Sequence, residues 1–287
     1  MNVRLQLLRV KHYIKNLLIF TPLFFARQLL DKDVLVSYIV PFIAFCLAAS
    51  IIYITNDICD LEKDKLHPEK QKRPIASGKI SCKEAGIWII GLFLIEVALC
   101  FFNSAVQNAI GWIVIYVAIN LFYSYGGKNI PIVDVILLAS GFVIRVMYGA
   151  KVGNIEVSVW LNLTIWAFSL YLGMGKRMKE VMLQNKDETR KVLRYYSAHY
   201  LGNMMHMCMT MTVLFYALWS TNVYGNSNAP SLMVWTVPLI IVIIMRYEMQ
   251  IEDEKTMGDP INVLLKDKYL LILTLVYILL SGILIYR

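Results

Sequence analysis

The stretch VLVSYIVPFIAFCLAASIIYITNDICDLEKD, from Val34 to Asp64, decides the fold class of this protein. It carries no charged residue between Val34 and Thr55, and about 20 mostly apolar residues are enough for an α-helix to cross a lipid bilayer. The apolar residues surround the helix axis instead of alternating, which argues against the strands of about 10 residues that build membrane β-barrels. The stretch therefore predicts a membrane-spanning helix that ends in an acidic segment.

The composition of the whole chain is typical of a membrane protein. Of its 287 residues, 58% are hydrophobic and 17% are charged, whereas soluble domains carry about 25% charged residues. Lys and Arg outnumber Asp and Glu by 28 to 20, and the long apolar runs favour a membrane over nucleic acid as the reason for this excess. Five cysteines without CxxC spacing argue against a disulfide scaffold or a zinc site.

Nine apolar runs along the chain are long enough to cross a membrane. We therefore predict an all-α integral membrane protein with nine transmembrane helices, in which residues 1–287 form a single membrane domain. The predicted spans lie near residues 13–30, 34–55, 84–103, 108–125, 131–150, 157–175, 204–222, 231–247 and 269–286.

The positions of Lys and Arg predict the orientation, because short cytoplasmic loops of membrane proteins contain these residues in excess. With the N-terminus in the cytoplasm, only four of the 28 cations fall on the opposite side of the membrane. The two longest hydrophilic stretches, near 56–83 and 176–203, then both face the cytosol. We therefore expect a multi-pass protein of the cell membrane with a cytoplasmic N-terminus.

The acidic segment has the composition of a metal site. On a helix, Asn56, Asp60 and Asp64 spread over about 80° of one face, with Asp57 at its edge. Carboxylate and amide oxygens suit a hard cation such as Mg²⁺, which proteins bind through carboxylates together with substrate phosphates. The pattern therefore predicts that these four residues hold Mg²⁺ on a diphosphate. A solvated helix end, whose carboxylates pair with nearby lysines, is the alternative.

Basic and aromatic residues near this segment are candidates for substrate binding. Lys70 and Arg73 follow the carboxylates directly and would neutralise phosphate charge. Lys15 and Lys128 lie at cytoplasmic span ends, where they either reach a phosphate or extend to lipid headgroups. Tyr123 is either a substrate contact or an aromatic residue of the membrane interface.

Arg145 is a candidate of a different kind, because it lies deep in the fifth predicted span. A charge at this depth costs at least about 2.5 kcal/mol unless it faces the bundle interior or water. Arg145 therefore either binds an anion, pairs with a buried acid of another helix, or extends to the outer interface.

The run from Asn56 to Gly78 resembles the first Asp-rich motif of the UbiA superfamily of intramembrane prenyltransferases. This resemblance implies nine helices, a cytosol-facing active-site cavity and a diphosphate bound through Mg²⁺. Within the superfamily, the pattern NDxxDxExDxxHPxKxxRPIASG is similar to the decaprenyl-phosphate phosphoribosyltransferase branch. Four further stretches also resemble this branch, namely Arg9-x-Lys11-x-x-x-Lys15-Asn16, with Val10 where Pro is usual, Tyr123-Ser124 with Lys128 and Asp134, Gly141 to Arg145, and Gly175-Lys176-Arg177 with Glu180.

The second hydrophilic stretch departs from the superfamily pattern. Members that use prenyl diphosphates carry a second Asp-rich motif after the sixth span, whereas this chain has Lys176 and Arg177 there. Cations at this position fit a donor with an additional phosphate, because Arg and Lys bind phosphate oxygens directly. The alternative is a topology signal with a helical ion pair between Lys176 and Glu180.

The resemblance implies a membrane-embedded transferase that moves 5-phosphoribose from phosphoribosyl pyrophosphate to a decaprenyl-like polyprenyl phosphate. It further implies release of pyrophosphate, dependence on Mg²⁺ and supply of a cell-wall precursor, with Asp57, Asp60 and Asp64 as catalytic residues. Two alternatives remain open. One is a UbiA-type prenyltransferase that moves a prenyl group from a prenyl diphosphate to an aromatic acceptor, and the other is a transporter or channel for anionic metabolites.

Overall fold

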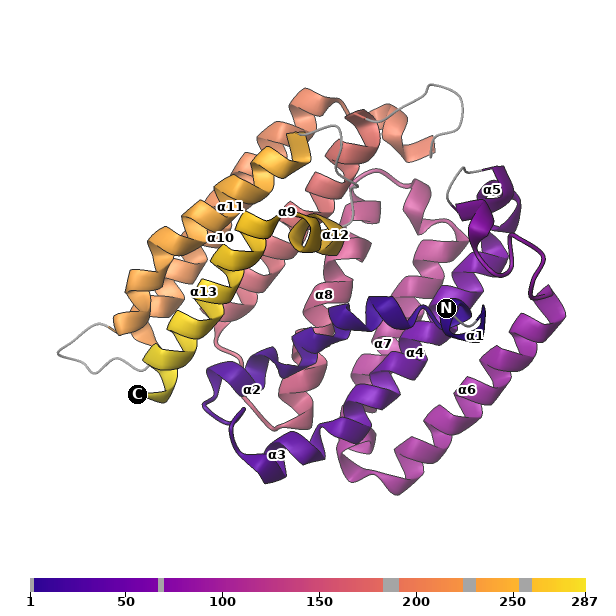
Figure 1. The fold of residues 1–287 in the computed structure, drawn as a ribbon, viewed down its shortest axis with the longest axis horizontal. Coiled ribbons are helices and arrows are strands. Elements are labelled where there is room, and N and C mark those ends of the chain that lie inside the picture. The colour runs from indigo at the N-terminus through magenta and orange to yellow at the C-terminus, as the bar shows by residue number, and fades with distance from the viewer. Residues whose placement is uncertain (1–2, 67–69, 183–190, 224–230, 253–259) are drawn as a thin grey trace. The chain divides into compact units, whose positions relative to one another are not determined.

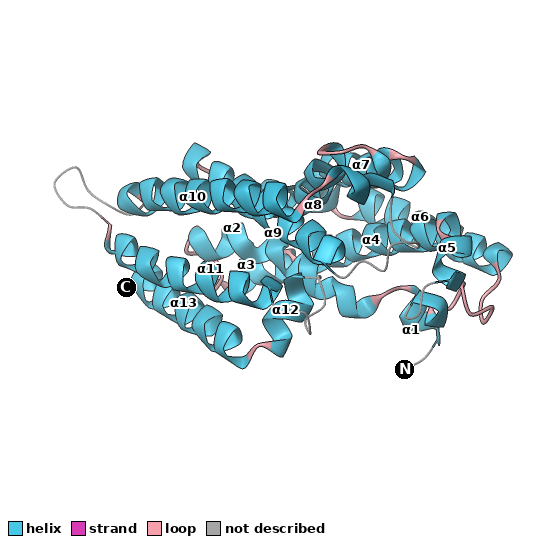
Figure 2. Cartoon of the chain, turned by 90° about the horizontal axis from the view of Figure 1, so that it is seen from above, coloured by secondary structure: helices cyan, strands magenta, loops and turns pink. Residues whose placement is uncertain are grey.

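The computed structural model describes residues 3–66, 70–182, 191–223, 231–252 and 260–287 (Figure 1). Within these ranges every regular element is a helix, and Figure 2 shows helices and loops without a strand. The prediction of an all-α protein is therefore confirmed for the described part of the chain.

The chain divides into two compact units. Unit 1 comprises Met1–Lys128 and Ile144–Ile155, and unit 2 comprises Asn129–Val143 and Glu156–Arg287. The helix α8 (Val133–Val152) contributes its first half to unit 2 and its second half to unit 1. That the chain forms a single membrane domain stays a prediction.

Unit 1 is built around a long central helix, α4, which packs against α6 and α7. The ring of Phe45 on α4 lies 4.8 Å from the ring of Tyr116 and 5.1 Å from that of Tyr148, measured between centroids. These aromatic residues are almost completely buried, and such ring pairs add to the stabilisation from apolar burial. The elements of this unit are α1 (Val3–Leu7), η1 (Val10–Phe20), α2 (Thr21–Phe25), α3 (Lys32–Ser37), α4 (Ile39–Cys59), α5 (Leu61–Leu66), η2 (Lys70–Lys72), α6 (Cys82–Phe102), α7 (Ser104–Tyr125) and most of η3 (Gly127–Asn129).

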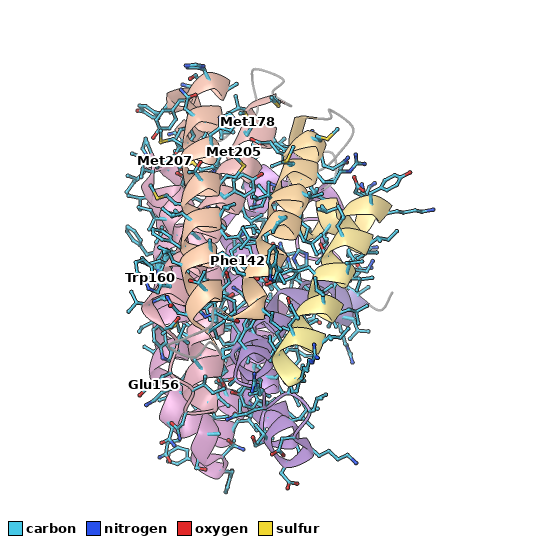
Figure 3. All side chains as sticks on the ribbon, turned by 90° about the vertical axis from the view of Figure 1, so that its left-hand side faces the viewer. Phe142, Glu156, Trp160, Met178, Met205 and Met207 are labelled. Carbon is cyan, nitrogen blue, oxygen red and sulfur yellow. The ribbon has the colours of Figure 1, made fainter. Side chains whose placement is uncertain are left out.

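In unit 2, the helices α9 and α10 pack against each other most extensively. The methyl group of Met205 lies near Gly175 of α9, and that of Met178 lies near Gly202 of α10. Met205 is buried whereas Met207 is half exposed, so the methionines of α10 divide between packing and surface (Figure 3). Besides the start of α8, the elements are α9 (Val159–Met182), η4 (Lys191–Tyr195), α10 (Ala198–Asn222), η5 (Leu232–Thr236), α11 (Val237–Glu252), α12 (Pro260–Lys266) and α13 (Lys268–Tyr286).

Short polar side chains set the beginnings of several helices. The side chain of Ser81 accepts a hydrogen bond from the backbone N–H of Glu84 at 3.1 Å, which satisfies a free donor in the first turn of α6. Asn103 does the same for Val106 at 3.0 Å in α7. Because Asn103 is the only residue between α6 and α7, these two apolar helices follow each other with a minimal connection.

Seven helices in the described part of the chain are long and apolar enough to cross a membrane, which supports membrane localisation. They correspond to seven of the nine predicted runs. Their bounds are Lys32–Cys59, Cys82–Phe102, Ser104–Tyr125, Val133–Val152, Ala198–Asn222, Leu232–Ile251 and Lys268–Tyr286.

The two remaining runs have a different character. The run 13–30 is not one α-helix, because the 3₁₀ helix η1 ends at Phe20 and Pro22 lies in the first turn of α2, a position that suits Pro because its missing N–H has no helical partner there. The run 157–175 falls in α9, which is 24 residues long. The count of nine spans and the cytoplasmic N-terminus stay predictions.

We expect Phe45→Ala to lower the thermal stability of the purified protein, because removing a fully buried phenyl ring costs about 3–5 kcal/mol. Phe93→Ala on α6 is the matched control, since Phe93 is 57% exposed. Thermal unfolding in detergent, followed by intrinsic fluorescence, measures both variants. Equal shifts of the unfolding midpoint would contradict the assignment of Phe45 to the core.

Candidate active site

The predicted metal-binding residues lie at the end of α4 and in α5, within unit 1. α4 ends before Asp60, which has φ −99° and ψ 10°, and α5 starts directly after it. Asp64 therefore lies on a different helix from Asn56 and Asp57. The prediction of one continuous helical face is wrong, because α4 stops before Asp60. The four residues form two pairs with different partners.

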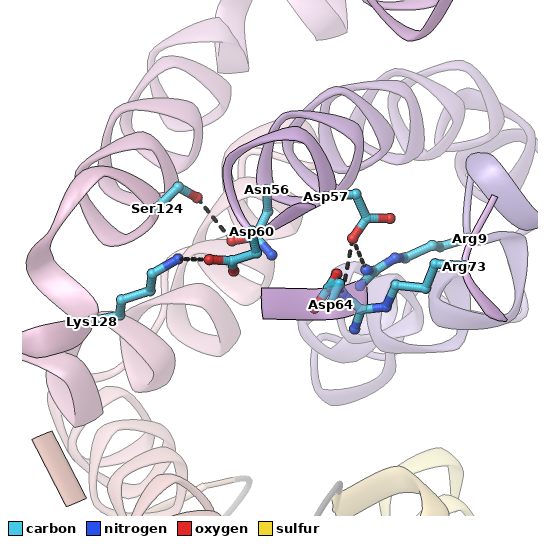
Figure 4. A network of polar contacts seen from close by, with 8 residues as sticks. All are labelled: Arg9, Asn56, Asp57, Asp60, Asp64, Arg73, Ser124 and Lys128. Atoms are coloured by element: carbon cyan, nitrogen blue, oxygen red, sulfur yellow. Dashed lines mark hydrogen bonds and ion pairs between the residues drawn. The ribbon is translucent and has the colours of Figure 1, made fainter. Parts of the chain in front are cut away.

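Asp57 and Asp64 form the first pair, and arginines hold them together (Figure 4). Arg73 donates to Oδ1 of Asp57 at 3.0 Å and to Oδ2 of Asp64 at 2.5 Å. Arg9, at the junction of α1 and η1, makes a further ion pair with Oδ1 of Asp57. The two carboxylates are 2% and 3% exposed. Because a buried ion costs several kcal/mol unless it is paired and hydrogen-bonded, the arginines are what allows both carboxylates to be buried.

Asn56 and Asp60 form the second pair, and they contact the end of α7 and η3 (Figure 4). Lys128 Nζ donates to Oδ1 of Asp60 at 2.6 Å, and the hydroxyl of Ser124 donates to Oδ1 of Asn56 at 3.2 Å. Lys128 is 7% exposed. This lysine is therefore directed into the polar cluster and not toward lipid headgroups.

The sequence positions of these partners argue against the alternative of a solvated helix end whose carboxylates pair with nearby lysines. The residues that bind the three carboxylates stand 9 to 68 positions away in the sequence. Lys65, in the same segment, pairs instead with the exposed carboxylate of Glu62 at 2.8 Å. The three aspartates are thus gathered by tertiary contacts, whereas the local lysine pairs only with a carboxylate at the surface.

The donor set suits Mg²⁺ chemically, because it consists of carboxylate and amide oxygens. In the described ranges, however, no group of three or more His, Cys, Asp and Glu side chains is arranged to hold a metal ion, and Arg or Lys binds each of the three carboxylates. Phosphate oxygens are equally good partners for these cations. The residues therefore fit a metal ion that arrives with a diphosphate better than a metal ion alone.

Two members of this cluster, Arg9 and Ser124, were missed as site residues by sequence reasoning. Arg9 stands 48 positions before Asp57, so no local spacing connects them. The available signal was that both residues lie in the stretches that resemble the phosphoribosyltransferase branch. Two other predicted binding residues lie close to members of the cluster in the sequence. Tyr123 directly precedes Ser124, and the backbone carbonyl of Lys70 accepts a hydrogen bond from the backbone N–H of Arg73 at 2.9 Å.

Arg145 lies deeper in unit 1, where an amide and a phenol accept hydrogen bonds from it. Its Nε donates to Oδ1 of Asn16 at 2.8 Å, and its Nη2 donates to the hydroxyl of Tyr116 at 3.2 Å. The guanidinium also lies over the rings of Phe45 and Tyr116, at 5.4 and 5.1 Å from their centroids. Arg145 is 5% exposed, so its charge faces the bundle interior, which is the condition under which such a charge is tolerated. That Arg145 binds substrate stays a prediction. Lys15 is partly buried next to Asn16.

In unit 2, Arg177 is at the centre of a buried polar cluster. Its Nε donates to Oδ2 of Asp134 at 2.5 Å, and its Nη1 donates to Glu180 at 2.5 Å. Asp134 also accepts a hydrogen bond from the hydroxyl of Tyr196 at 2.6 Å, and that hydroxyl accepts one from the backbone N–H of Ile132 at 2.6 Å. Arg177 and Asp134 are fully buried. These contacts connect the start of α8, the end of α9 and the residue that follows η4.

The protonation state of Tyr196 fits its role as a donor. Burial raises the pKa of its hydroxyl, and the hydrogen bond to the Asp134 carboxylate raises this pKa further. Tyr196 thus keeps the proton that it donates. Lys176, next to Arg177, is partly exposed. That Lys176 and Arg177 bind the donor stays a prediction.

Comparison with known proteins identifies the class. The model of the UbiA prenyltransferase family matches residues 18–260. The chain is 34% identical to the decaprenyl-phosphate phosphoribosyltransferase of Corynebacterium glutamicum, over 94% of this chain and 83% of that protein. It is 33% identical to the enzyme of the same name from Mycolicibacterium smegmatis, over 97% of this chain and 91% of that protein.

Solved structures show the same fold. A UbiA homolog from Archaeoglobus fulgidus, bound to GPP and Mg²⁺, superposes with a TM-score of 0.73 at 17% sequence identity and 99% coverage of both chains. The same homolog has also been solved bound to DMAPP and Mg²⁺, again with a TM-score of 0.73. The chain belongs to the UbiA prenyltransferase family and is a transferase. Among its curated relatives are decaprenyl-phosphate phosphoribosyltransferases.

We expect Arg177→Met to destabilise the protein by about 3–5 kcal/mol, because it leaves the fully buried carboxylate of Asp134 without its cation. Lys176→Met removes one positive charge at the neighbouring, partly exposed position and is expected to have a small effect. Thermal unfolding in detergent compares the two. If Lys176→Met were as destabilising as Arg177→Met, the buried ion pair would not be the reason.

Proposed function

We propose that this protein transfers 5-phosphoribose from phosphoribosyl pyrophosphate to a polyprenyl phosphate and releases pyrophosphate. The observation that carries this proposal is the cluster in unit 1, in which three buried or partly buried carboxylates and three cations meet at the end of one apolar helix. The relatives named as decaprenyl-phosphate phosphoribosyltransferases support this choice of donor and acceptor.

In this proposal Mg²⁺ enters together with the donor. Asp57, Asp60 and Asp64, with Asn56, would hold it, and it would supply positive charge to the departing pyrophosphate. Arg73 and Lys128 are paired with these carboxylates, and in the proposed complex they would bind phosphate oxygens of the donor.

The chemical step forms a bond between an oxygen of the acceptor phosphate and the anomeric carbon of the ribose. The bond from this carbon to pyrophosphate breaks, and its electron pair leaves with pyrophosphate. Arg9, Arg73 and Lys128 stabilise the charge that grows on the leaving group, which is the kind of electrostatic support that lowers such barriers. The acceptor phosphate is ionised at neutral pH, so it attacks without a general base.

Further binding residues follow from their positions. Lys70 and Tyr123 are chain neighbours of Arg73 and Ser124, and we assign them to the rim of the donor site. Lys15 lies on η1, between Arg9 and the deeper polar groups. Lys176 is assigned to the additional phosphate of the donor. We place the site on the cytoplasmic side, where the excess of Lys and Arg in the adjoining segments supports this orientation.

The test of donor and acceptor uses the purified protein in nanodiscs with Mg²⁺. Labelled phosphoribosyl pyrophosphate is offered with a polyprenyl phosphate, and a prenyl diphosphate is offered separately with an aromatic acid. We expect label on the polyprenyl phosphate only. Product in the prenyl reaction alone would replace the proposal with an aromatic prenyltransferase, and transport of a substrate without product would replace it with a carrier.

We expect Asp57→Asn and Asp60→Asn each to lower kcat by about 100-fold or more, because each removes a charge that holds the donor's metal. Glu62→Gln is the matched control, since Glu62 lies in the same segment with its side chain 81% exposed, and it should keep full activity. Thermal unfolding shows whether each variant is folded. Full activity in both aspartate variants would remove the proposed metal site.

A further inference from the structure

Arg9, which contacts the central carboxylate of the site, has a backbone conformation that needs external support. Its φ of 51° and ψ of 44° lie in the left-handed region, which non-glycine residues seldom adopt and which persists only when surrounding contacts enforce it. Arg9 directly precedes η1. The position of η1 therefore determines whether the Arg9 guanidinium reaches Asp57.

A line of polar contacts attaches η1 to α4. After the ion pair of Arg9 and Asp57, the hydroxyls of Tyr13 and Ser50 are hydrogen-bonded at 2.7 Å. One step deeper, Nδ2 of Asn16 donates to the sulfur of Cys46 at 3.1 Å. The contacts run in opposite directions along the two elements, so η1 and α4 are antiparallel. We call this line of three contacts the polar seam.

The second half of α8 fixes the deep end of the polar seam. Arg145 donates to Asn16 at 2.8 Å and to Tyr116 at 3.2 Å, so it connects η1 to α7. Four residues further along α8, a Cβ atom added to Gly149 would overlap the backbone carbonyl of Ile19. The backbones of α8 and η1 are thus in direct contact, and only glycine fits at this position.

The deep end of the polar seam is far from the carboxylates. Cys46 and Asp57 are eleven positions apart on the continuous helix α4, which corresponds to about 16 Å along its axis. Arg145 reaches the seam at the level of Cys46, through Asn16. Arg145 is therefore too far away to contact the donor's diphosphate, and it can influence this site only by positioning η1 and Arg9.

We propose that Arg145 and Gly149 are positioning residues for the diphosphate site, which hold η1 so that Arg9 stays at Asp57. The inference rests on the proposed function insofar as Arg9 receives a phosphate oxygen of the donor. Lys is no substitute for Arg at position 145, because its single ammonium group lacks the planar fork that reaches Asn16 and Tyr116 at once. Ala at position 149 displaces η1 without removing any polar group.

The experiment measures binding of inorganic pyrophosphate, with Mg²⁺, to the full chain in nanodiscs by isothermal titration calorimetry. We expect Arg145→Lys and Gly149→Ala each to weaken binding by about tenfold or more, since displacements of about 1 Å at a site have effects of this size. Tyr116→Phe removes one hydroxyl and is a milder variant that tests the same contact. Its effect should be smaller and in the same direction.

Combination with Arg9→Ala distinguishes positioning from general destabilisation. If Arg145 acts through Arg9, then Arg145→Lys and Gly149→Ala cause no further loss of affinity in the Arg9→Ala protein. An equal additional loss in that background would overturn the inference. Val106→Ala is the matched control, because Val106 is buried in the same apolar cluster at the start of α7, and it should lower thermal stability without changing the affinity.

The two proposals fail in different ways. If Arg9→Ala binds pyrophosphate as tightly as the unchanged protein, then the assigned donor site is wrong. If Arg9→Ala weakens binding but Arg145→Lys, Gly149→Ala and Tyr116→Phe do not, then the donor site stands and the positioning role is overturned.

Discussion

The ion pairs of Arg73 with Asp57 and Asp64 hold the candidate site together. Asp57 lies in the last turn of α4 and Asp64 lies on α5, so without a shared cation the two buried carboxylates would repel each other and separate the helices. Arg9 and Lys128 then attach the N-terminal segment and the end of α7 to the same helix end. The packing of unit 1 around the end of α4 thus depends on ion pairs between buried side chains.

The same charges could also bind a diphosphate together with a divalent metal ion. The cations and carboxylates of the cluster neutralise one another, which avoids the high cost of unpaired buried ions. A diphosphate with a divalent metal offers each of them a new partner of opposite sign, so the cluster can open without leaving a charge unpaired.

Two buried arginines show how much depends on tertiary partners. Both were candidates for substrate binding, Arg145 because it lies deep in a predicted span and Arg177 because it stands where a second Asp-rich motif is usual. Arg177 faces two carboxylates, whereas the described hydrogen bonds of Arg145 lead to an amide and a phenol. The first arrangement stabilises a buried ion pair, and the second fixes the place of η1. Sequence spacing does not separate these cases, since Asp134 stands 43 positions from Arg177, and the partners of Arg145 stand 29 and 129 positions away.

The sequence by itself determined the helical class, the membrane-spanning character of seven helices, and the acidic segment that marks the site, because hydropathy and residue type act locally. It also placed Asn56, Asp57, Asp60, Asp64, Arg73 and Lys128 among the functional candidates. The tertiary structure alone decided how they pair, that Asp64 joins Asp57 across a break at Asp60, and that Arg9 and Ser124 complete the cluster. These outcomes depend on contacts between residues that are distant in the sequence. Such contacts form only when the helices pack, because packing buries the charged side chains and a buried charge is stable only beside an opposite charge.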